Sequence, residues 1–258
     1  MDYWRKQQDK PLYPDLLWSK PVTKRGAGKL LIIGGNAHGF SNVAQVYAEA
    51  DRFGAGHIRA VVPDSLSKLT KGLPFIEYAP SNPSGGFAKS ALGTLLELAE
   101  WSDGVLIAGD LGKNSETSLL LDSFLDTCPG LVIISPEGLS SISISTNELV
   151  FSPNRVVIWT RSELQKATIS LKMSKTVTSQ TGKSQFAEIL HDVSIWALAN
   201  IVEIDEYTIW VACNGEVIST DTDMVSISAK FAVWAIQNPT KIKEALVCAS
   251  WELKSSNP

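Results

Sequence analysis

The residues Gly34, Gly35 and Asn36 lie between a short apolar run and a polar stretch with helical spacing, in the segment LLIIGGNAHGFSNVAQ. Many α/β proteins bind a phosphate or a nucleotide where a buried strand turns at glycines into a helix. Glycine lets the backbone approach a phosphate closely, and the amino end of a helix attracts negative charge. The segment therefore predicts either a turn that binds an anion, or a turn that has the same backbone shape and binds nothing.

Other segments that could carry chemistry lack the spacing that the chemistry needs. The TGKS at 181–184 ends like a phosphate loop, but no glycine precedes it at the required distance, so we predict a mobile loop over 176–185. The serine-rich stretch 138–146 contains no GxSxG and is predicted to be loop and edge strand. The three cysteines and three histidines show no zinc-ligand spacing, which predicts reduced, mostly buried thiols and no metal site.

Composition narrows the class of protein. The 258 residues are enough for one large α/β domain, and 44% hydrophobic and 19% charged residues are ordinary for a globular protein. A formal net charge of −4 gives no basic field for nucleic acid. No apolar run reaches the roughly 20 residues of a membrane helix, and the first residues lack the apolar core of a signal peptide. We therefore expect a cytoplasmic protein with no nucleic-acid or membrane partner.

Short apolar runs alternate with amphipathic stretches along most of the chain. The runs predict strands at 29–35, 57–63, 104–109, 131–135 and 155–160. The amphipathic stretches predict helices at 41–53 with Ser41 as N-cap, at 90–101 and from Ser115. This alternation predicts a mainly parallel central sheet with helices on both faces.

The two ends of the chain differ from this pattern. Closely spaced strands at 201–205, 207–215 and 216–220, with a turn at Asn214-Gly215, predict an antiparallel edge near the C-terminus, followed by helices at 224–236 and 239–250. Residues 1–28 predict an extended arm anchored by Trp4, Tyr13 and Trp18. The remaining residues, 29–258, are predicted to form a single domain.

Six landmarks follow one another in a familiar order. They are PVTKRGAGKLLIIGGN, ADRFGAGHIRAVVP, SDGVLIAGDLGKNSET, LVIISPEGL, VVIWTRSELQKA and TDTDMVS. Their order, over about residues 21–252, resembles the ribokinase-like fold and, more narrowly, the ADP-dependent NAD(P)H-hydrate dehydratases. That family repairs hydrated nicotinamide cofactors and uses ADP or ATP to drive the dehydration. The resemblance implies a ribokinase-like fold, ADP or ATP with Mg²⁺ as candidate cofactors, and an NAD(P)H-like ligand.

The resemblance also implies site residues. The family holds phosphate with the backbone N–H groups of a Gly-Thr-Gly-Asp motif, which matches the TDTD at 220–223. By this match Asp223 is the catalytic acid/base, and Thr220 and Thr222 are nucleotide-binding positions. The substrate-binding positions implied by the other landmarks are Gly34, Gly35, Asn42, Gly109, Gly112, Thr160 and Glu163.

The match fails at several of these positions. Threonines replace both glycines of the anion-binding motif, and β-branched residues disfavour positive φ and close approach to phosphate. Asp221 adds negative charge where the family binds an anion. An alternative role for Asp221 or Asp223 is to cap the final helix. The matching glycines can serve only to turn the chain at strand ends, and Glu163 can complement a helix dipole.

Three hypotheses follow. The first is a diverged family member with a degraded nucleotide and substrate site and weak or no dehydratase activity, a pseudoenzyme that acts as a binding or scaffold protein, with homo-oligomer formation through the N-terminal arm. The second is an active ADP/ATP-dependent dehydratase, or a small-molecule kinase of the same fold, with Asp223 as acid/base. The third is an unrelated α/β protein whose glycine turns mimic the family, which a different strand order would reveal.

Overall fold

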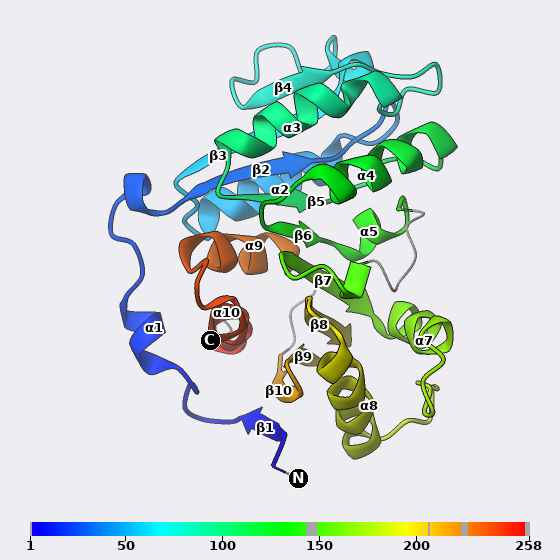
Figure 1. Cartoon of the computed structure of the whole chain (residues 1–258). Coiled ribbons are helices and arrows are strands. Elements are labelled where there is room, and N and C mark those ends of the chain that lie inside the picture. Colours follow the sequence, from blue (N-terminus) through cyan, green and yellow to red (C-terminus); the bar gives the residue numbers. More distant parts are fainter. Residues whose placement is uncertain (1, 143–148, 206, 223–226, 256–258) are drawn as a thin grey trace. The chain divides into compact units, whose positions relative to one another are not determined.

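The computed structural model describes residues 2–142, 149–205, 207–222 and 227–255 (Figure 1). The chain forms two compact units. Unit 1 contains Met1–Lys20, Ser145–Ile227 and Asn238–Pro258, and unit 2 contains Pro21–Ile144 and Ser228–Gln237. None of the described helices is long and apolar enough to cross a membrane.

In the described part of unit 2, five parallel strands lie in the order β6-β5-β2-β3-β4. They are β2 (Lys29–Ile33), β3 (His57–Pro63), β4 (Ile76–Ala79), β5 (Gly104–Ile107) and β6 (Val132–Ile134). In β2, the four residues after Lys29 are fully buried, as a parallel strand covered on both faces requires. The predicted strands of this unit are therefore confirmed, and β4 is one that the sequence analysis missed.

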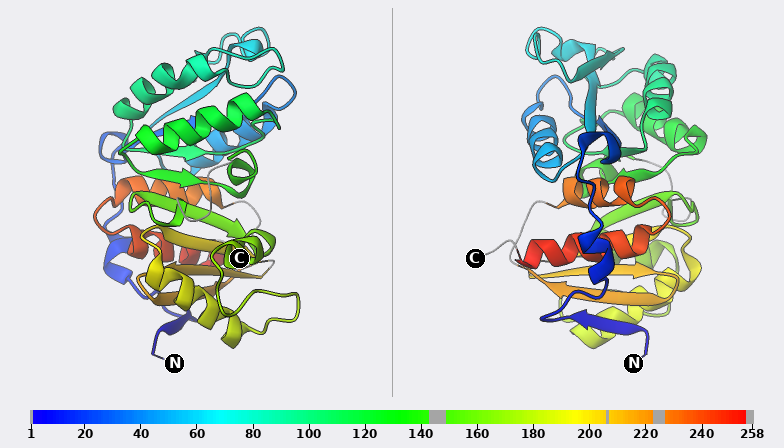
Figure 2. Two further views of the ribbon diagram at one scale, coloured as in Figure 1. Left: turned by 45° about the vertical axis from the view of Figure 1, so that its right-hand side comes forward. Right: turned by 90° about the vertical axis from the view of Figure 1, so that its left-hand side faces the viewer.

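Helices cover both faces of these strands. They are α2 (Ser41–Arg52), α3 (Leu92–Trp101), α4 (Ser115–Thr127), α5 (Pro136–Leu139) and α9 (Ser228–Gln237), with single turns η1 (Lys24–Gly26), η2 (Asp64–Leu66) and η3 (Lys89–Ala91). Figure 2 shows α2 on one face and α3 and α4 on the other. Helix α9 arrives from far along the chain and packs on α2, β2 and β5.

The described residues of unit 1 form five strands in the order β7-β8-β9-β10-β1. They are β1 (Trp4–Gln7), β7 (Arg155–Thr160), β8 (Asn200–Asp205), β9 (Thr208–Cys213) and β10 (Glu216–Asp221). Strand β9 runs antiparallel to both of its neighbours, while β8 is parallel to β7 and β1 is parallel to β10. The predicted antiparallel edge is confirmed, and its turn at Asn214 and Gly215 has φ of 49° and 78°, which a two-residue hairpin needs.

The helices of unit 1 are α1 (Pro14–Trp18), α7 (Arg161–Ser170), α8 (Lys183–Trp196) and α10 (Ile242–Ser255). Both α8 and α10 pack on β9 and β10. The ring of Phe186 on α8 contacts Trp210 of β9, at a centroid distance of 5.2 Å. The arm places β1 at the edge of the sheet, and Trp4 donates to Ser219 at 3.0 Å. Trp18, by contrast, is 89% exposed and anchors nothing among the described residues.

Several predicted boundaries are wrong. Helix α2 begins at Ser41, so its N-cap is Phe40, and no side chain caps it. The loop predicted over 176–185 ends early because α8 begins at Lys183. The loop and edge strand predicted over 138–146 begin inside α5, and residues 143–146 lie outside the described part, as do residues 224–226 of the predicted helix 224–236.

Candidate functional site

In unit 2, neighbouring backbone atoms leave no room for a side chain in the turn after β2. A Cβ on Gly34 would lie 2.0 Å from the carbonyl oxygen of Ala108, far inside contact distance. Gly35, directly after it, has φ of +87°, the left-handed region that favours glycine. Both glycines therefore have a backbone reason to be present, whatever the turn binds.

The loop after β5 repeats this arrangement and lies beside the first turn. Gly109 and Gly112 have φ of +82° and +77°. The side-chain amide of Asn36 donates to the carbonyl oxygen of Asp110 at 3.0 Å, and the backbone N–H of Gly112 donates to the Asp110 carboxylate at 2.8 Å. A Cβ on Gly109 would lie 3.5 Å from the Cβ of Asn42. The fold thus brings the five predicted substrate-binding positions of unit 2 together: Gly34, Gly35, Asn42, Gly109 and Gly112.

In unit 1, Thr160 and Glu163 form the capping box of α7. The backbone N–H of Thr160 donates to the Glu163 carboxylate at 2.8 Å, and the Thr160 hydroxyl donates to the same oxygen at 2.9 Å. In return, the backbone N–H of Glu163 donates to the Thr160 hydroxyl oxygen at 3.4 Å. These bonds satisfy backbone donors that the first turn of a helix leaves free. The two predicted substrate-binding residues are therefore in contact with each other, and together they cap the amino end of α7.

The predicted nucleotide-binding threonines are held by neighbouring polar groups. Thr220 is the fifth residue of β10 and is fully buried. Its hydroxyl accepts from the Gln7 side chain at 2.8 Å and lies 2.9 Å from the hydroxyl of Ser250. The backbone N–H of Thr222 donates to the carbonyl oxygen of Tyr207 at 3.0 Å. Asp223, the predicted catalytic residue, lies outside the described residues.

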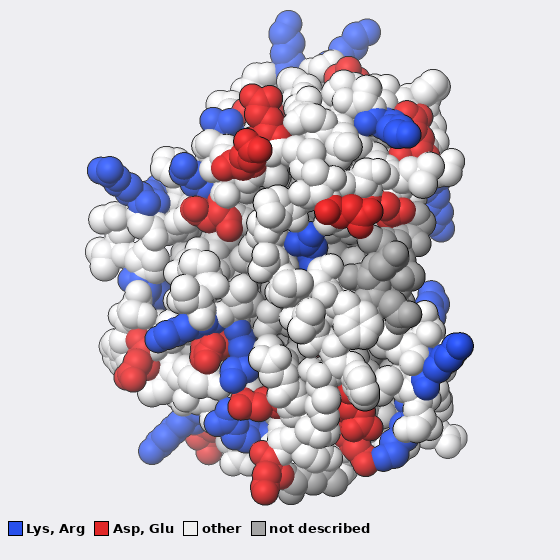
Figure 3. Space-filling model, viewed as in Figure 1, with Lys and Arg blue, Asp and Glu red and all other residues white. Residues whose placement is uncertain are grey.

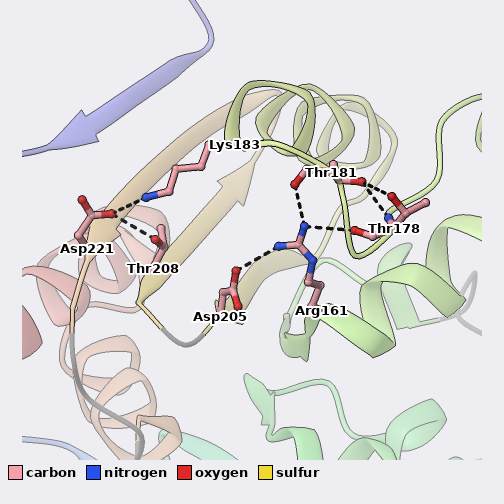
Figure 4. Close-up of polar contacts among 7 residues, drawn as sticks. All are labelled: Arg161, Thr178, Thr181, Lys183, Asp205, Thr208 and Asp221. Carbon is pink, nitrogen blue, oxygen red and sulfur yellow. Dashed lines mark hydrogen bonds and ion pairs between the residues drawn. The ribbon is translucent and has the colours of Figure 1, made fainter.

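Asp221, between the two threonines, is the centre of an ion-pair cluster, and Figure 4 shows its contacts with Lys183 and Thr208. Its carboxylate lies 2.6 Å from the ammonium of Lys6 and 3.1 Å from that of Lys183, and it accepts from the Thr208 hydroxyl at 3.1 Å. Partial burial alone would raise the pKa of Asp221, but the hydrogen bonds from the two lysines outweigh it and lower the pKa. Asp221 is therefore a carboxylate at neutral pH, already neutralised by this chain's own cations.

A second polar cluster lies around Arg161, directly after β7. Its guanidinium donates to Asp205 at 3.1 Å and to the carbonyl oxygens of Thr178 and Thr181 at 3.2 and 2.8 Å (Figure 4). These bonds tie down part of the loop that was predicted to be mobile. The sequence analysis missed Arg161, although its position at the carboxyl end of a parallel strand is where α/β proteins place functional side chains.

Glu203 in β8 is a buried acid that the sequence analysis also missed. It is fully buried, and neither of its carboxylate oxygens has a hydrogen-bond partner among the described residues. Burial, and after it the negative charge of Asp205, raise the pKa of Glu203 to about 8, against the opposing effect of Arg161. Glu203 is therefore largely protonated at neutral pH. The Nε of Arg161 is likewise buried without a described partner.

The described residues of the 220–222 stretch do not fit a phosphate. A carboxylate lies between two threonines whose polar groups already have partners, where an anion needs free backbone N–H groups and positive charge. No group of three or more His, Cys, Asp or Glu suited to a metal ion occurs in the described part of the chain. Cys128, Cys213 and Cys248 form no disulfide, and burial raises the pKa of the Cys248 thiol to about 12.

Sequence comparison places the chain near known repair enzymes, although no family model matches it. It is 31% identical over 145 residues to the bifunctional NAD(P)H-hydrate repair enzyme Nnr of Dictyoglomus turgidum, which covers 53% of this chain and 28% of that enzyme. It is 26% identical over 131 residues to the Nnr enzyme of Salinibacter ruber, covering 49% of this chain and 24% of that enzyme. The matches thus span about a quarter of these curated relatives.

Comparison with solved structures defines the fold. A ribokinase-like superfamily protein from Enterococcus faecalis matches with a TM-score of 0.65 at 15% identity, over 97% of this chain and 87% of that one. The ADP/ATP-dependent NAD(P)H-hydrate dehydratase of Bacillus subtilis, crystallised with ATP and Mg²⁺, matches with a TM-score of 0.58 at 13% identity, over 96% and 89%.

This chain has a ribokinase-like α/β fold. Within that class, its sequence resembles the NAD(P)H-hydrate repair enzymes. The predicted fold class and the predicted resemblance are confirmed, and the hypothesis of an unrelated α/β protein is wrong.

Proposed function

We propose that this chain is a divergent relative of the NAD(P)H-hydrate dehydratases in which internal ion pairs have replaced the nucleotide site, leaving weak or no dehydratase activity. One observation carries the proposal. In the stretch that matches the family's anion-binding motif, the carboxylate of Asp221 is held by Lys6 and Lys183.

Electrostatics explains why this arrangement disfavours a nucleotide. Two like charges about 4 Å apart repel by roughly 1 kcal/mol in water and by more near a protein surface. The two lysines that could neutralise a phosphate already neutralise Asp221, so a phosphate would have to displace that carboxylate first. The buried hydroxyl of Thr220 is bonded to Gln7 and Ser250 and is turned into the core of unit 1.

The residues that still match the family do not argue against this proposal. The glycines of unit 2 are required by the backbone at their positions, and Thr160 and Glu163 are explained by helix capping. Each would be kept by a protein that preserved the fold and lost the reaction.

The test is a thermal-shift titration of the full chain with ADP, ATP, AMP and NADPH, each with and without Mg²⁺. A ligand that binds only the folded state stabilises it by about 2.7 kcal/mol at a hundredfold excess over Kd. We expect no shift at millimolar nucleotide, and weak or no dehydration of hydrated NADPH. The Bacillus subtilis dehydratase in the same buffers is the positive control. A clear shift with ADP or ATP together with turnover would overturn the proposal.

The second candidate is an active ADP/ATP-dependent dehydratase, or a small-molecule kinase of the same fold. The two glycine turns of unit 2 favour this candidate. The hydrogen bond from Asn36 to Asp110 joins the turns, and five positions that match the family lie together around them. In this case Asp223→Asn abolishes turnover and leaves the thermal midpoint nearly unchanged. Turnover that survives this substitution would remove Asp223 from the mechanism.

A further inference from the structure

Unit 1 carries an apolar groove beside the carboxyl end of α8. The groove has a volume of about 560 Å³, and its apolar wall includes Phe151, Met173, Ile195 and Trp196. The backbone N–H of Leu198 donates to the carbonyl oxygen of Val150 at 2.8 Å, which holds the end of α8 against the residues around 150. Segments from three parts of the chain thus form one surface.

This surface leaves large apolar side chains in water. Trp196 is 69% exposed, Ile195 and Leu198 are each 56% exposed, and Phe151 is 46% exposed. Single exposed apolar residues are ordinary, but a contiguous group of them marks a binding surface. Tryptophan is among the residue types most enriched at the few positions that dominate protein interfaces, and Trp196 is the most exposed member of this group.

The core of unit 1 does not explain these residues. Helix α8 buries Phe186, Ile189, Leu190 and Val193, which recur at helical spacing and form one stripe facing β9 and β10. Ile195 and Trp196 lie outside that stripe. The helix therefore has a second apolar face, which the described part of the chain leaves open.

Charge at the groove distinguishes the candidate occupants. Lys172 and Asp192 both line it, and among the described residues neither lies within ion-pair distance of an opposite charge, although the charge of Asp192 contributes to raising the pKa of Lys175. A surface with one cation and one anion beside an apolar centre can pair with a copy of itself, because a two-fold axis sets each charge opposite the other kind. An acidic or a basic partner would meet one of these charges with repulsion.

We propose that this groove is the interface through which two copies of the chain pair about a two-fold axis. Trp196 of each copy enters the groove of the other, and Lys172 of each copy faces the partner's Asp192. The interface is independent of the proposed loss of the nucleotide site, since none of its residues belongs to the stretch 220–222 or to the glycine turns. It also differs from the predicted association through the N-terminal arm.

Sedimentation velocity of the full chain over a range of concentrations tests the proposal. We expect a dimer that Trp196→Ser weakens about thirtyfold or more, the effect of losing an interface hot spot. The matched control is Trp18→Ser, which removes an 89% exposed tryptophan from α1 and should leave the dimer unchanged. A wild-type chain that is monomeric at every concentration overturns the proposal, as does a dimer lost in Trp18→Ser and kept in Trp196→Ser.

A charge exchange tests the two-fold geometry directly. Lys172→Glu and Asp192→Lys should each weaken self-association, because each places like charges opposite one another. An equimolar mixture of these two variants should form a mixed dimer with wild-type affinity, because both contacts are then attractive. Thermal midpoints near the wild-type value establish that the variants are folded. A mixture that associates no better than the separate variants overturns the proposed pairing.

Discussion

The glycine turns of unit 2 and the stretch 220–222 of unit 1 both correspond to motifs in the resemblance to the dehydratases, and the two regions differ in how far they keep the matching residues. The turns keep the matching residues, and a side chain at Gly34 would meet the backbone of Ala108. The stretch has lost its glycines: the hydroxyl of Thr220 bonds to Gln7, and Asp221 beside it is held by Lys6 and Lys183.

This difference separates two reasons for a residue to match a family. A glycine required by sterics is kept as long as the fold is kept, so its presence reports the fold. A glycine that serves a phosphate can be replaced once the phosphate is no longer needed, so its loss reports the function. Four predictions test which residues of the two units serve the fold and which serve a ligand.

The largest expected effect concerns the turn after β2. Gly34→Ala should lower the free energy of unfolding by about 3 kcal/mol, because the added Cβ overlaps a backbone oxygen that cannot move away. Urea denaturation measures it. The control is Gly93→Ala on the exposed side of α3, where a Cβ meets nothing within 4 Å and stability should rise by up to about 1 kcal/mol. An unchanged midpoint in Gly34→Ala would mean that this glycine is present for a ligand.

The second prediction concerns the buried acid of unit 1. The folded state holds the Glu203 proton up to about pH 8, while the unfolded state releases it near its usual pKa. The contribution of Glu203 to the free energy of unfolding is therefore fully present below the unfolded-state pKa, and it is lost as the pH rises toward about 8. Between about pH 6.5 and about pH 7.5 the free energy of unfolding should fall by about 1.4 kcal/mol.

Glu203→Gln should abolish this slope, because an amide cannot release the proton. Denaturation at several pH values measures the slope, and Glu97→Gln, at an exposed position of α3, is the control that should keep it. If wild type and Glu203→Gln share one pH profile, Glu203 is ionised in the fold and is paired there.

The third prediction concerns the capping box of α7. Thr160→Ala should lower the free energy of unfolding by about 1 kcal/mol, whereas Thr160→Ser should keep most of it, since serine also caps a helix. Thermal and urea denaturation give the values. A Thr160→Ala variant with wild-type stability and impaired ligand binding would assign Thr160 to a site.

The fourth prediction concerns Asp221, where a substitution should have the smallest effect on stability and should raise the affinity for ADP. The side chain of Asp221 is 41% exposed and its two lysine partners are 40% and 59% exposed, so Asp221→Asn should change the free energy of unfolding by less than about 0.5 kcal/mol. The substitution removes one repulsion of about 1 kcal/mol and frees two lysines, so any ADP affinity should rise about fivefold. Calorimetric titration measures it, with Asp51→Asn in unit 2 as control. Equal ADP affinity in wild type and Asp221→Asn would show that this carboxylate does not exclude phosphate.

Much of the fold could be predicted from local sequence. The strands at 57–63 and 155–160 were predicted to the residue, because a short apolar run bounded by polar or turn residues is itself a strand signal. Short or polar elements such as β1 (Trp4–Gln7) and β4 were missed, since their pairing partners rather than their own composition make them strands.

The site was predictable only in part. Glycines after strands marked the turns of unit 2, and the fold brings them together as the family resemblance implies. The Arg161 cluster and the buried Glu203 were missed, because a single charged residue in or after a strand gives no periodic signal.

The sequence by itself determined which segments form strands and helices, and which family this chain resembles, because apolar spacing and glycine positions are local properties. Only the tertiary structure decided the partners of Asp221, since Lys6 comes from the N-terminal arm and Lys183 from the start of α8. It also decided that Glu203 is buried and that Trp196 is exposed. Burial and ion pairing depend on which distant segments the sheet brings together, and no local pattern contains that information.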